Sequence, residues 1–163
     1  MTVLVPMSPD TYAAYLAAAV AGYAQDNVDS GRWPAAGALA RSTADFEDSL
    51  PQGLQTTDNY LYEIKSAESG PTVGFIWFAV EEKLGLRSAF VYDVELKPEF
   101  RRRGHATAAF AALERLVREL RLSSIGLHVF AHNTGAQALY RKLGYSVTSV
   151  NMLKHLAAAP CAD

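Results

Sequence analysis

The stretch that decides the fold is Lys97-Pro98-Glu99-Phe100-Arg101-Arg102-Arg103-Gly104-His105-Ala106-Thr107. It separates a segment that alternates like a strand from one with the period of an amphipathic helix. The first N–H groups of a helix lack intrahelical partners and lie at the positive end of its dipole, so such a turn can bind phosphate oxygens. Gly104 and Ala106 would let a ligand approach the main chain, and the arginines add local positive charge. A solvated arginine turn is the alternative interpretation.

The chain after this turn alternates between helix and strand patterns. Phe110, Leu113, Val117 and Leu120 recur at helical spacing and form an apolar stripe. Gly144 is a residue typical of helix ends. We therefore expect a helix over residues 104–121, a strand over 125–130, a helix over 134–143 and a last strand over 145–156.

The chain before the turn begins with a strong helix signal. Ser8 and Pro9 are a capping residue and a first-turn proline, and apolar residues follow at three- and four-residue spacing. That stripe comprises Tyr12, Leu16, Ala19, Val20 and Tyr23. Turn-forming residues at 68–71 predict a hairpin between two later strands. We expect a strand over residues 2–7, helices over 9–29 and 34–50, and strands over 59–67, 73–80 and 87–96.

The strand over 87–96 carries two carboxylates that its apolar pattern does not explain. Strict alternation places Phe90, Tyr92, Val94 and Leu96 on one face, and Asp93 and Glu95 on the other. We interpret it as a central strand with a chemical role for its acidic face.

Strands mixed with helices, and one late strand-helix-strand unit, predict a single α/β (α+β) domain with a largely antiparallel sheet. A chain of 163 residues, half of them hydrophobic, is long enough for one core. We place the domain at residues 1–156 and interpret the Ala-rich residues 157–163 as a flexible tail.

Composition limits the classes of function. A formal charge of −2 gives no overall attraction to nucleic acid or to an anionic membrane, and no segment approaches the ~20 apolar residues of a membrane span. Cys161 is the single cysteine, so no intramolecular disulfide and no Cys/His zinc site are expected. We expect a cytoplasmic protein without a bound metal.

A second motif lies about thirty residues after the first. It is Asn133-Thr134-Gly135-Ala136-Gln137-Ala138-Leu139-Tyr140-Arg141-Lys142-Leu143-Gly144-Tyr145. Together the two stretches resemble the A and B motifs of the GCN5-related N-acetyltransferases (GNAT). Arg101, Gly104 and Ala106 fill the fixed places of the A motif, while His105 replaces its usual apolar residue. The resemblance implies a mixed sheet of six to seven strands with splayed central strands, flanked by about four helices.

The resemblance also implies acetyl-CoA as the acyl donor. The pantetheine arm would pair with the strand backbone at Val94, Glu95 and Leu96. Asn133 and Ala136 would contact the cofactor, and Tyr140 would lie beside its sulfur. The pyrophosphate would rest on the turn that Arg101 opens, at the N–H groups of Arg102, Arg103, Gly104, His105, Ala106 and Thr107.

Catalysis requires a proton donor for the departing thiolate and an acceptor for the proton of the amine. Tyr140 matches the family's proposed acid, although it also lies on an apolar helix face where a tyrosine can serve as core. Glu95 and His128 are equal candidates for the base. Asp93 ranks behind them, and a water chain is a further alternative.

Acceptor recognition is the part that this sequence describes least. Tyr23, Arg32, Trp33 and residues 50–57 are candidates for the acceptor pocket, although core packing is the favoured interpretation for Tyr23 and Trp33. His105 and His132 are expected to be solvent-exposed.

We expect an N-acetyltransferase that moves an acetyl group from acetyl-CoA to a primary amine by direct attack in a ternary complex. The alternative is a catalytically silent CoA-binding domain, and a dinucleotide-binding domain is weaker because the glycine pattern is incomplete. Dimers are common among proteins that it resembles, so a homodimer is a further expectation.

Overall fold

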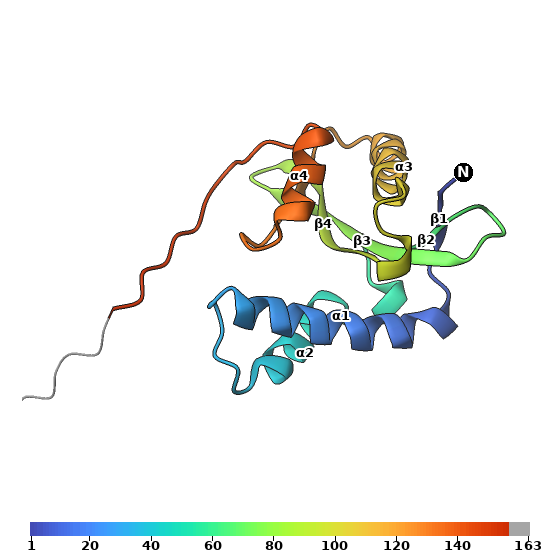
Figure 1. The fold of residues 1–163 in the computed structure, drawn as a ribbon. Coiled ribbons are helices and arrows are strands. Elements are labelled where there is room, and N and C mark those ends of the chain that lie inside the picture. Colours follow the sequence, from blue (N-terminus) through green and yellow to red (C-terminus); the bar gives the residue numbers. More distant parts are fainter. Residues whose placement is uncertain (157–163) are drawn as a thin grey trace, which may run out of the picture.

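A five-stranded sheet in the order β1-β2-β3-β4-β5 organises the protein (Figure 1). The structure is a computed structural model that describes residues 1–156. Neighbouring strands are antiparallel, except β4 and β5, which are parallel. The expected fold class is confirmed, with five strands in place of six to seven. The strands are β1 (Val3–Pro6), β2 (Asn59–Lys65), β3 (Thr72–Lys83), β4 (Leu86–Leu96) and β5 (Ile125–Leu127).

Four helices cover the two faces of the sheet, α1 and α2 on one and α3 and α4 on the other (Figure 1). Each pair closes its own cluster of buried side chains: Tyr15 and Trp77 belong to the α1–α2 side, and Phe110 and Tyr140 to the α3–α4 side. The helices are α1 (Pro9–Asp29), α2 (Ala38–Ser49), α3 (His105–Glu119) and α4 (Thr134–Lys142), with short 3-10 turns η1 (Gly53–Gln55) and η2 (Pro98–Phe100).

Helix α1 begins where its capping residues predict. The Ser8 hydroxyl accepts a hydrogen bond from the N–H of Thr11 at 3.3 Å, which supplies a partner to one of the first-turn N–H groups that have none within the helix. Among its hydrophobic side chains the most deeply buried is nevertheless Tyr15, which the predicted stripe omits. The predicted residues Tyr12 and Leu16 flank it and are only partly buried.

A β-bulge interrupts the pairing of β3 with β4. Trp77 pairs with Asp93, but the next pair along the ladder is Phe78 with Val91. Tyr92 is therefore an extra residue on β4. Because side chains alternate along a strand, one extra residue moves everything beyond it to the opposite face.

Because of the bulge, the predicted assignment of the β4 side chains to the two faces of the sheet is wrong. Val94 and Leu96 pack against the cluster under α3 and α4. Phe90 instead contacts Tyr92, at 5.1 Å between ring centroids, and Tyr92 stacks on Trp77 on the α1–α2 side. The four apolar residues that strict alternation grouped together thus divide between the two faces of the sheet.

Strands β4 and β5 separate partway along their length. Their pairing ends at Val91 and Leu127, whereas β4 continues to Leu96. The strand expected to reach Phe130 is therefore three residues shorter, and the edge of β4 beyond the bulge lacks a strand partner on this side among the described residues.

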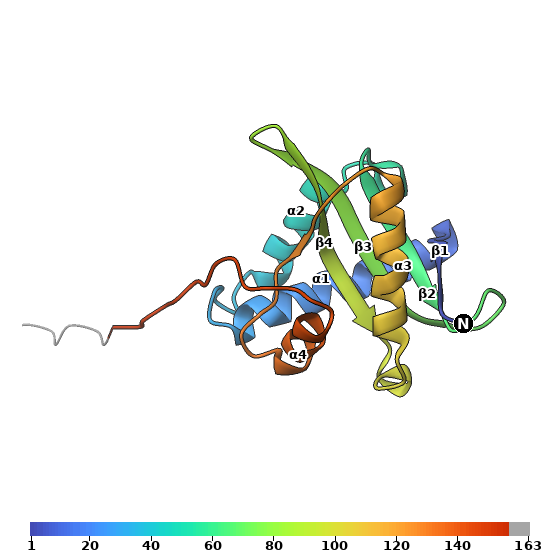
Figure 2. The same ribbon diagram turned by 90° about the horizontal axis from the view of Figure 1, so that it is seen from above.

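The last strand expected over residues 145–156 does not form, and these residues have neither helical nor strand structure. A strand requires a hydrogen-bonded neighbour, and the segment runs outward from the fold (Figures 1 and 2). The predicted tail, with Cys161, lies outside the described residues. No helix within residues 1–156 is long and apolar enough to cross a membrane.

Candidate active site

A cleft of about 1410 Å³ opens where β4 and β5 separate. Helices α1 and α2, the bulged half of β4, the start of α3 and helix α4 all contribute to its walls. Most of the predicted site residues line it, namely Val94, Glu95, Leu96, Arg101, Arg102, Gly104, His105, Ala106, Thr107, His128, Asn133, Ala136 and Tyr140. Arg103 does not line the cleft, and its guanidinium lies 6.0 Å from the ring centroid of Phe100.

The turn between β4 and α3 is held open by two left-handed residues. Arg102 has φ +61° and Gly104 has φ +85°, and a Cβ atom added at Gly104 would meet nothing within 4 Å. The Arg101 side chain anchors the turn by donating from Nε to the Leu96 carbonyl at 2.9 Å. No side chain caps α3, so its first N–H groups are free to meet a ligand.

The two histidines expected in solvent differ from each other. His105 is the first residue of α3 and is partly buried, with Nδ1 2.9 Å from the Thr2 hydroxyl. The expectation of simple exposure was wrong for it, because β1 covers the start of α3. His132 is exposed and lies 3.4 Å from the Asp26 carboxylate.

Tyr140 reaches the cleft from α4. It is buried, and its ring meets those of Phe110 and Tyr145 at centroid distances of 5.5 and 5.8 Å. Burial, and secondarily the charge of Asp93, raises the pKa of Tyr140 to about 12. The phenol is therefore fully protonated near neutral pH.

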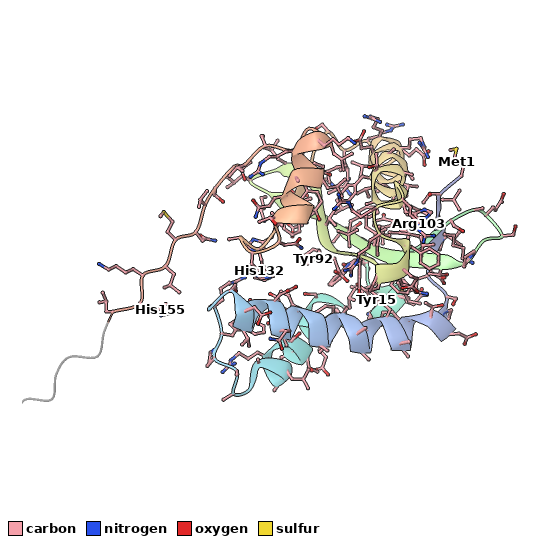
Figure 3. All side chains as sticks on the ribbon, in the orientation of Figure 1. Met1, Tyr15, Tyr92, Arg103, His132 and His155 are labelled. Atoms are coloured by element: carbon pink, nitrogen blue, oxygen red, sulfur yellow. The ribbon has the colours of Figure 1, made fainter. Side chains whose placement is uncertain are left out.

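Asp93 is the carboxylate that the bulge turns toward α1. The Tyr15 hydroxyl donates to its Oδ2 at 2.9 Å (Figure 3 labels Tyr15 between α1 and the sheet). Burial raises the pKa of Asp93 to about 6, and the negative charge of Glu95 adds to this effect. The hydrogen bond from Tyr15 acts in the opposite direction and lowers the pKa. Sequence reasoning missed Tyr15, although its spacing of three from Tyr12 and four from Ala19 places it on the inner helix face.

The two bases preferred from the sequence occupy different surroundings. Glu95 is exposed at the cleft surface. His128 follows the end of β5, is partly buried, and packs edge-on against Phe130 at 5.0 Å. Burial, together with the charge of Arg32, lowers the pKa of His128, so its imidazole is neutral at neutral pH.

The α1–α2 end of the cleft differs from the predicted acceptor pocket. The candidates Tyr23 and Arg32 line it, but Trp33 packs on Tyr23 outside the lining, and residues 50–57 do not reach it. Instead it is walled by three acidic residues that the sequence did not single out, Asp26 of α1 and Asp45 and Asp48 of α2.

Comparison with known proteins agrees with this architecture. The profile of the family described as "Acetyltransferase (GNAT) family" matches residues 30–145. The chain belongs to this family. The turn between β4 and α3 and Tyr140 both fall within the matched GNAT region.

Among GNAT relatives, the chain is 36% identical to the uncharacterized N-acetyltransferase YycN of Bacillus subtilis (strain 168), over 94% of this chain and 97% of YycN. It is 32% identical to YdgE of the same organism, over 92% of this chain and 95% of YdgE. The crystal structure of the putative acetyltransferase YycN matches with a TM-score of 0.91, covering 97% of this chain and 100% of YycN. The structure of AAC(6')-Iy in complex with a CoA-containing bisubstrate analogue shares the fold at 17% identity and a TM-score of 0.58, covering 97% of this chain and 99% of that one.

Proposed function

We propose that this GNAT protein transfers an acetyl group from acetyl-CoA to a primary amine by direct attack within a ternary complex. One observation carries the proposal: an uncapped helix start and a protonated phenol face the same cleft, beside an unpaired strand edge. The first can hold a diphosphate and the second can protonate a thiolate.

The donor would lie across the α3–α4 side of the cleft. The open turn offers free N–H groups and the positive end of the α3 dipole to the pyrophosphate. The edge of β4 at Val94, Glu95 and Leu96 would hydrogen-bond the amide groups of the pantetheine arm, because β5 has already diverged there. Asn133 and Ala136 would flank this arm from the start of α4. The CoA-containing ligand of AAC(6')-Iy, a protein of the same fold, supports this choice of donor.

The chemistry follows from these positions. The lone pair of a neutral amine attacks the thioester carbonyl, a C–N bond forms, and the C–S bond breaks as the tetrahedral intermediate collapses. Tyr140 donates its proton to the departing sulfur, which leaves as a thiol, and the proton that the nitrogen loses as the amide forms restores the Tyr140 phenol. No acyl-enzyme is required, because donor and acceptor share one cleft.

The incoming ammonium must first lose a proton, and Asp93 is our preferred acceptor. It is oriented by Tyr15, it lies close enough to Tyr140 to influence that pKa, and it is ionised at neutral pH. Glu95 and the neutral His128 are the alternative acceptors, and a pH–rate profile of each variant separates the three.

The acceptor would enter from the α1–α2 end. Ammonium groups favour the negative potential of Asp26, Asp45 and Asp48, whereas the arginines of the turn attract the anionic donor. The cleft is therefore suited to one anionic and one cationic substrate.

Release of CoA thiol from acetyl-CoA in the presence of a panel of amines tests the proposal. In Tyr140→Phe we expect kcat to fall about 100-fold, while the Kd for acetyl-CoA stays within about twofold, because the variant loses only a transition-state interaction. Tyr60→Phe is the matched control, since Tyr60 does not line the cleft.

Equal rates for Tyr140→Phe and the wild type would remove the acid role. Tight CoA binding without turnover of any amine would instead support the silent CoA-binding domain.

A further inference from the structure

Among the described residues that line the cleft, Arg32 is the only cationic side chain from α1, α2 and the turn between them. It shares this wall with the carboxylates of Asp26, Asp45 and Asp48. A guanidinium repels a cationic acceptor, so the ammonium group proposed above does not account for its presence. Arg32 serves either as a counter-ion to these carboxylates or as a group that meets a ligand.

The geometry does not support a counter-ion role for Arg32. Within residues 1–156 its guanidinium forms no ion pair. Asp26 lies instead 3.4 Å from Nε2 of His132, which Figure 3 labels near the end of α1. An arginine that neutralised this wall would lie within ion-pair distance of one of its carboxylates. The guanidinium is therefore available to a ligand.

Both the main chain and the side chain of Arg32 are held in place. The N–H groups of Arg32 and Trp33 donate to the carbonyl of Asn27 at 3.0 and 3.1 Å. The guanidinium carbon lies 6.0 Å from the ring centroid of Phe130, in the segment after β5. A cation–π contact of this kind orients the planar group and leaves its N–H donors free to bind a ligand. The side chain is thus arranged for binding before a ligand arrives.

Arg32 lies toward the end of the cleft where the acyl group would react. The pairing of β5 with β4 ends at Leu127, so His128 lies where the two strands begin to separate. Burial lowers the pKa of His128, and the charge of Arg32 adds to this effect, so the two side chains are close. The turn proposed for the pyrophosphate follows the other end of the opening, beyond Leu96. A ligand group that meets Arg32 would therefore belong to the acceptor.

We propose that Arg32 binds a carboxylate of the acceptor, which is an amino acid, either free or as the last residue of a peptide. This inference rests on the proposed function, because it concerns the amine that the cleft would acetylate. A guanidinium pairs with a carboxylate through two parallel hydrogen bonds. An acceptor such as lysine, with one carboxylate and two amines, matches both signs of charge on this wall. One amine would react beside Asp93, and the second ammonium would meet Asp45 and Asp48.

Lysine, lysinamide and cadaverine test this assignment, because they share two amines and only lysine has the carboxylate. With acetyl-CoA as donor, we expect kcat/KM for lysine to exceed that for the other two by about tenfold. Arg32→Gln should lower kcat/KM for lysine by about tenfold and leave that for cadaverine and the Kd for acetyl-CoA within about twofold. Arg87→Gln is the matched control, since Arg87 is exposed on β4 and does not line the cleft. Glycyl-lysine in place of lysine distinguishes the end of a peptide from a free amino acid.

Calorimetry supplies a second measurement that requires no turnover. Lysine should bind the CoA complex of the wild type, and Arg32→Gln should weaken this binding by about tenfold. An equal loss of kcat/KM for lysine and cadaverine in Arg32→Gln, or equal use of both by the wild type, overturns carboxylate recognition and leaves the transferase proposal intact. Absence of thiol release with every amine, while binding of lysine still depends on Arg32, overturns the proposed transfer and supports the carboxylate site. Lysine that binds the two proteins equally overturns the site.

Discussion

Tyr140 and Asp93 face one cleft with pKa values displaced in ways that suit opposite tasks. Burial raises the pKa of Tyr140 to about 12, so the phenol keeps the proton that it donates in the proposed mechanism. Burial also raises the pKa of Asp93, but only to about 6, so the carboxylate is ionised at neutral pH and can accept one. Two groups whose environments separate their protonation states are suited to act as an acid–base pair, which supports the proposed roles.

Removal of the Tyr15 hydroxyl tests the role of Asp93. Because Asp93 must be ionised to accept a proton, kcat/KM should rise with pH through about 6 in the wild type. The hydrogen bond from Tyr15 favours the charged form, so Tyr15→Phe should raise the pKa and move this limb to higher pH by about one unit.

Tyr12→Phe is the control for the pH profile of Tyr15→Phe, because Tyr12 is also a residue of α1 but does not line the cleft. An unmoved acid limb in Tyr15→Phe would transfer the role of base to Glu95 or His128.

A substitution at Gly104 tests the proposed binding of the pyrophosphate by the turn between β4 and α3. Gly104→Asp should weaken acetyl-CoA binding at least tenfold, because it places a carboxylate where the pyrophosphate approaches the main chain. Gly85→Asp is a matched control, since both glycines have positive φ and open space around the added Cβ. Calorimetry that gives equal affinities for the two variants would contradict the assignment.

Among the elements, α1 is fixed to the sheet by a buried carboxylate. Glu63 of β2 is only 6% exposed and accepts the hydroxyls of Thr11 in α1 and Thr72 in β3. Burial opposes its ionisation, but these hydrogen bonds and the N–H of Ser8 outweigh that effect and lower the pKa of Glu63. The helix that carries Tyr15 is thereby held in register with β2 and β3.

Glu63→Gln should lower the free energy of unfolding by about 1.5–3 kcal/mol, because it loses hydrogen bonds to a charged group. Since the folded pKa is lowered, this stabilisation is present above the unfolded value and is lost as pH falls through the folded pKa. Urea denaturation should therefore show a difference at pH 7 that shrinks in acid. Glu68→Gln, at an exposed turn position, should leave stability unchanged.

At the scale of the whole molecule, charge is separated along the cleft although the chain has a net charge of only −2. The arginines of the turn line one part of the cleft, and the carboxylates of α1 and α2, which outnumber the single guanidinium of Arg32 beside them, line the other. Neither α1 nor α2 forms this part of the cleft alone. Their approach to the bulged half of β4 creates the negative end where an amine would enter.

The double variant Asp45→Asn/Asp48→Asn should raise KM for a cationic amine about tenfold and leave the Kd for acetyl-CoA unchanged, because it removes charge only at the acceptor end. The effect should diminish at high salt, since both residues are exposed. Glu47→Gln is the control, because Glu47 is exposed on α2 but does not line the cleft. An equal rise in KM for both variants would contradict acceptor recognition by this end.

The local signals of the sequence located the turn at Gly104, the capped start of α1 at Ser8 and the helix that carries Tyr140. Each depends on residues within a few positions of one another, so spacing and side-chain chemistry suffice to predict it. The bulge at Tyr92 leaves no comparable signal, since an extra residue is defined only against the partner strand. The hydrogen bond from Tyr15 to Asp93 joins residues 78 positions apart in the sequence and depends on that bulge.

The sequence by itself thus determined the family, the alternation of helices and strands, and the turn with free main-chain donors. Only the tertiary structure decided which carboxylate of β4 faces α1, how far β5 follows β4, and that residues 145–156 have no strand beside them within the described chain. The physical reason is that strand pairing and burial are properties of two segments at once. A pattern along one segment cannot specify its partner.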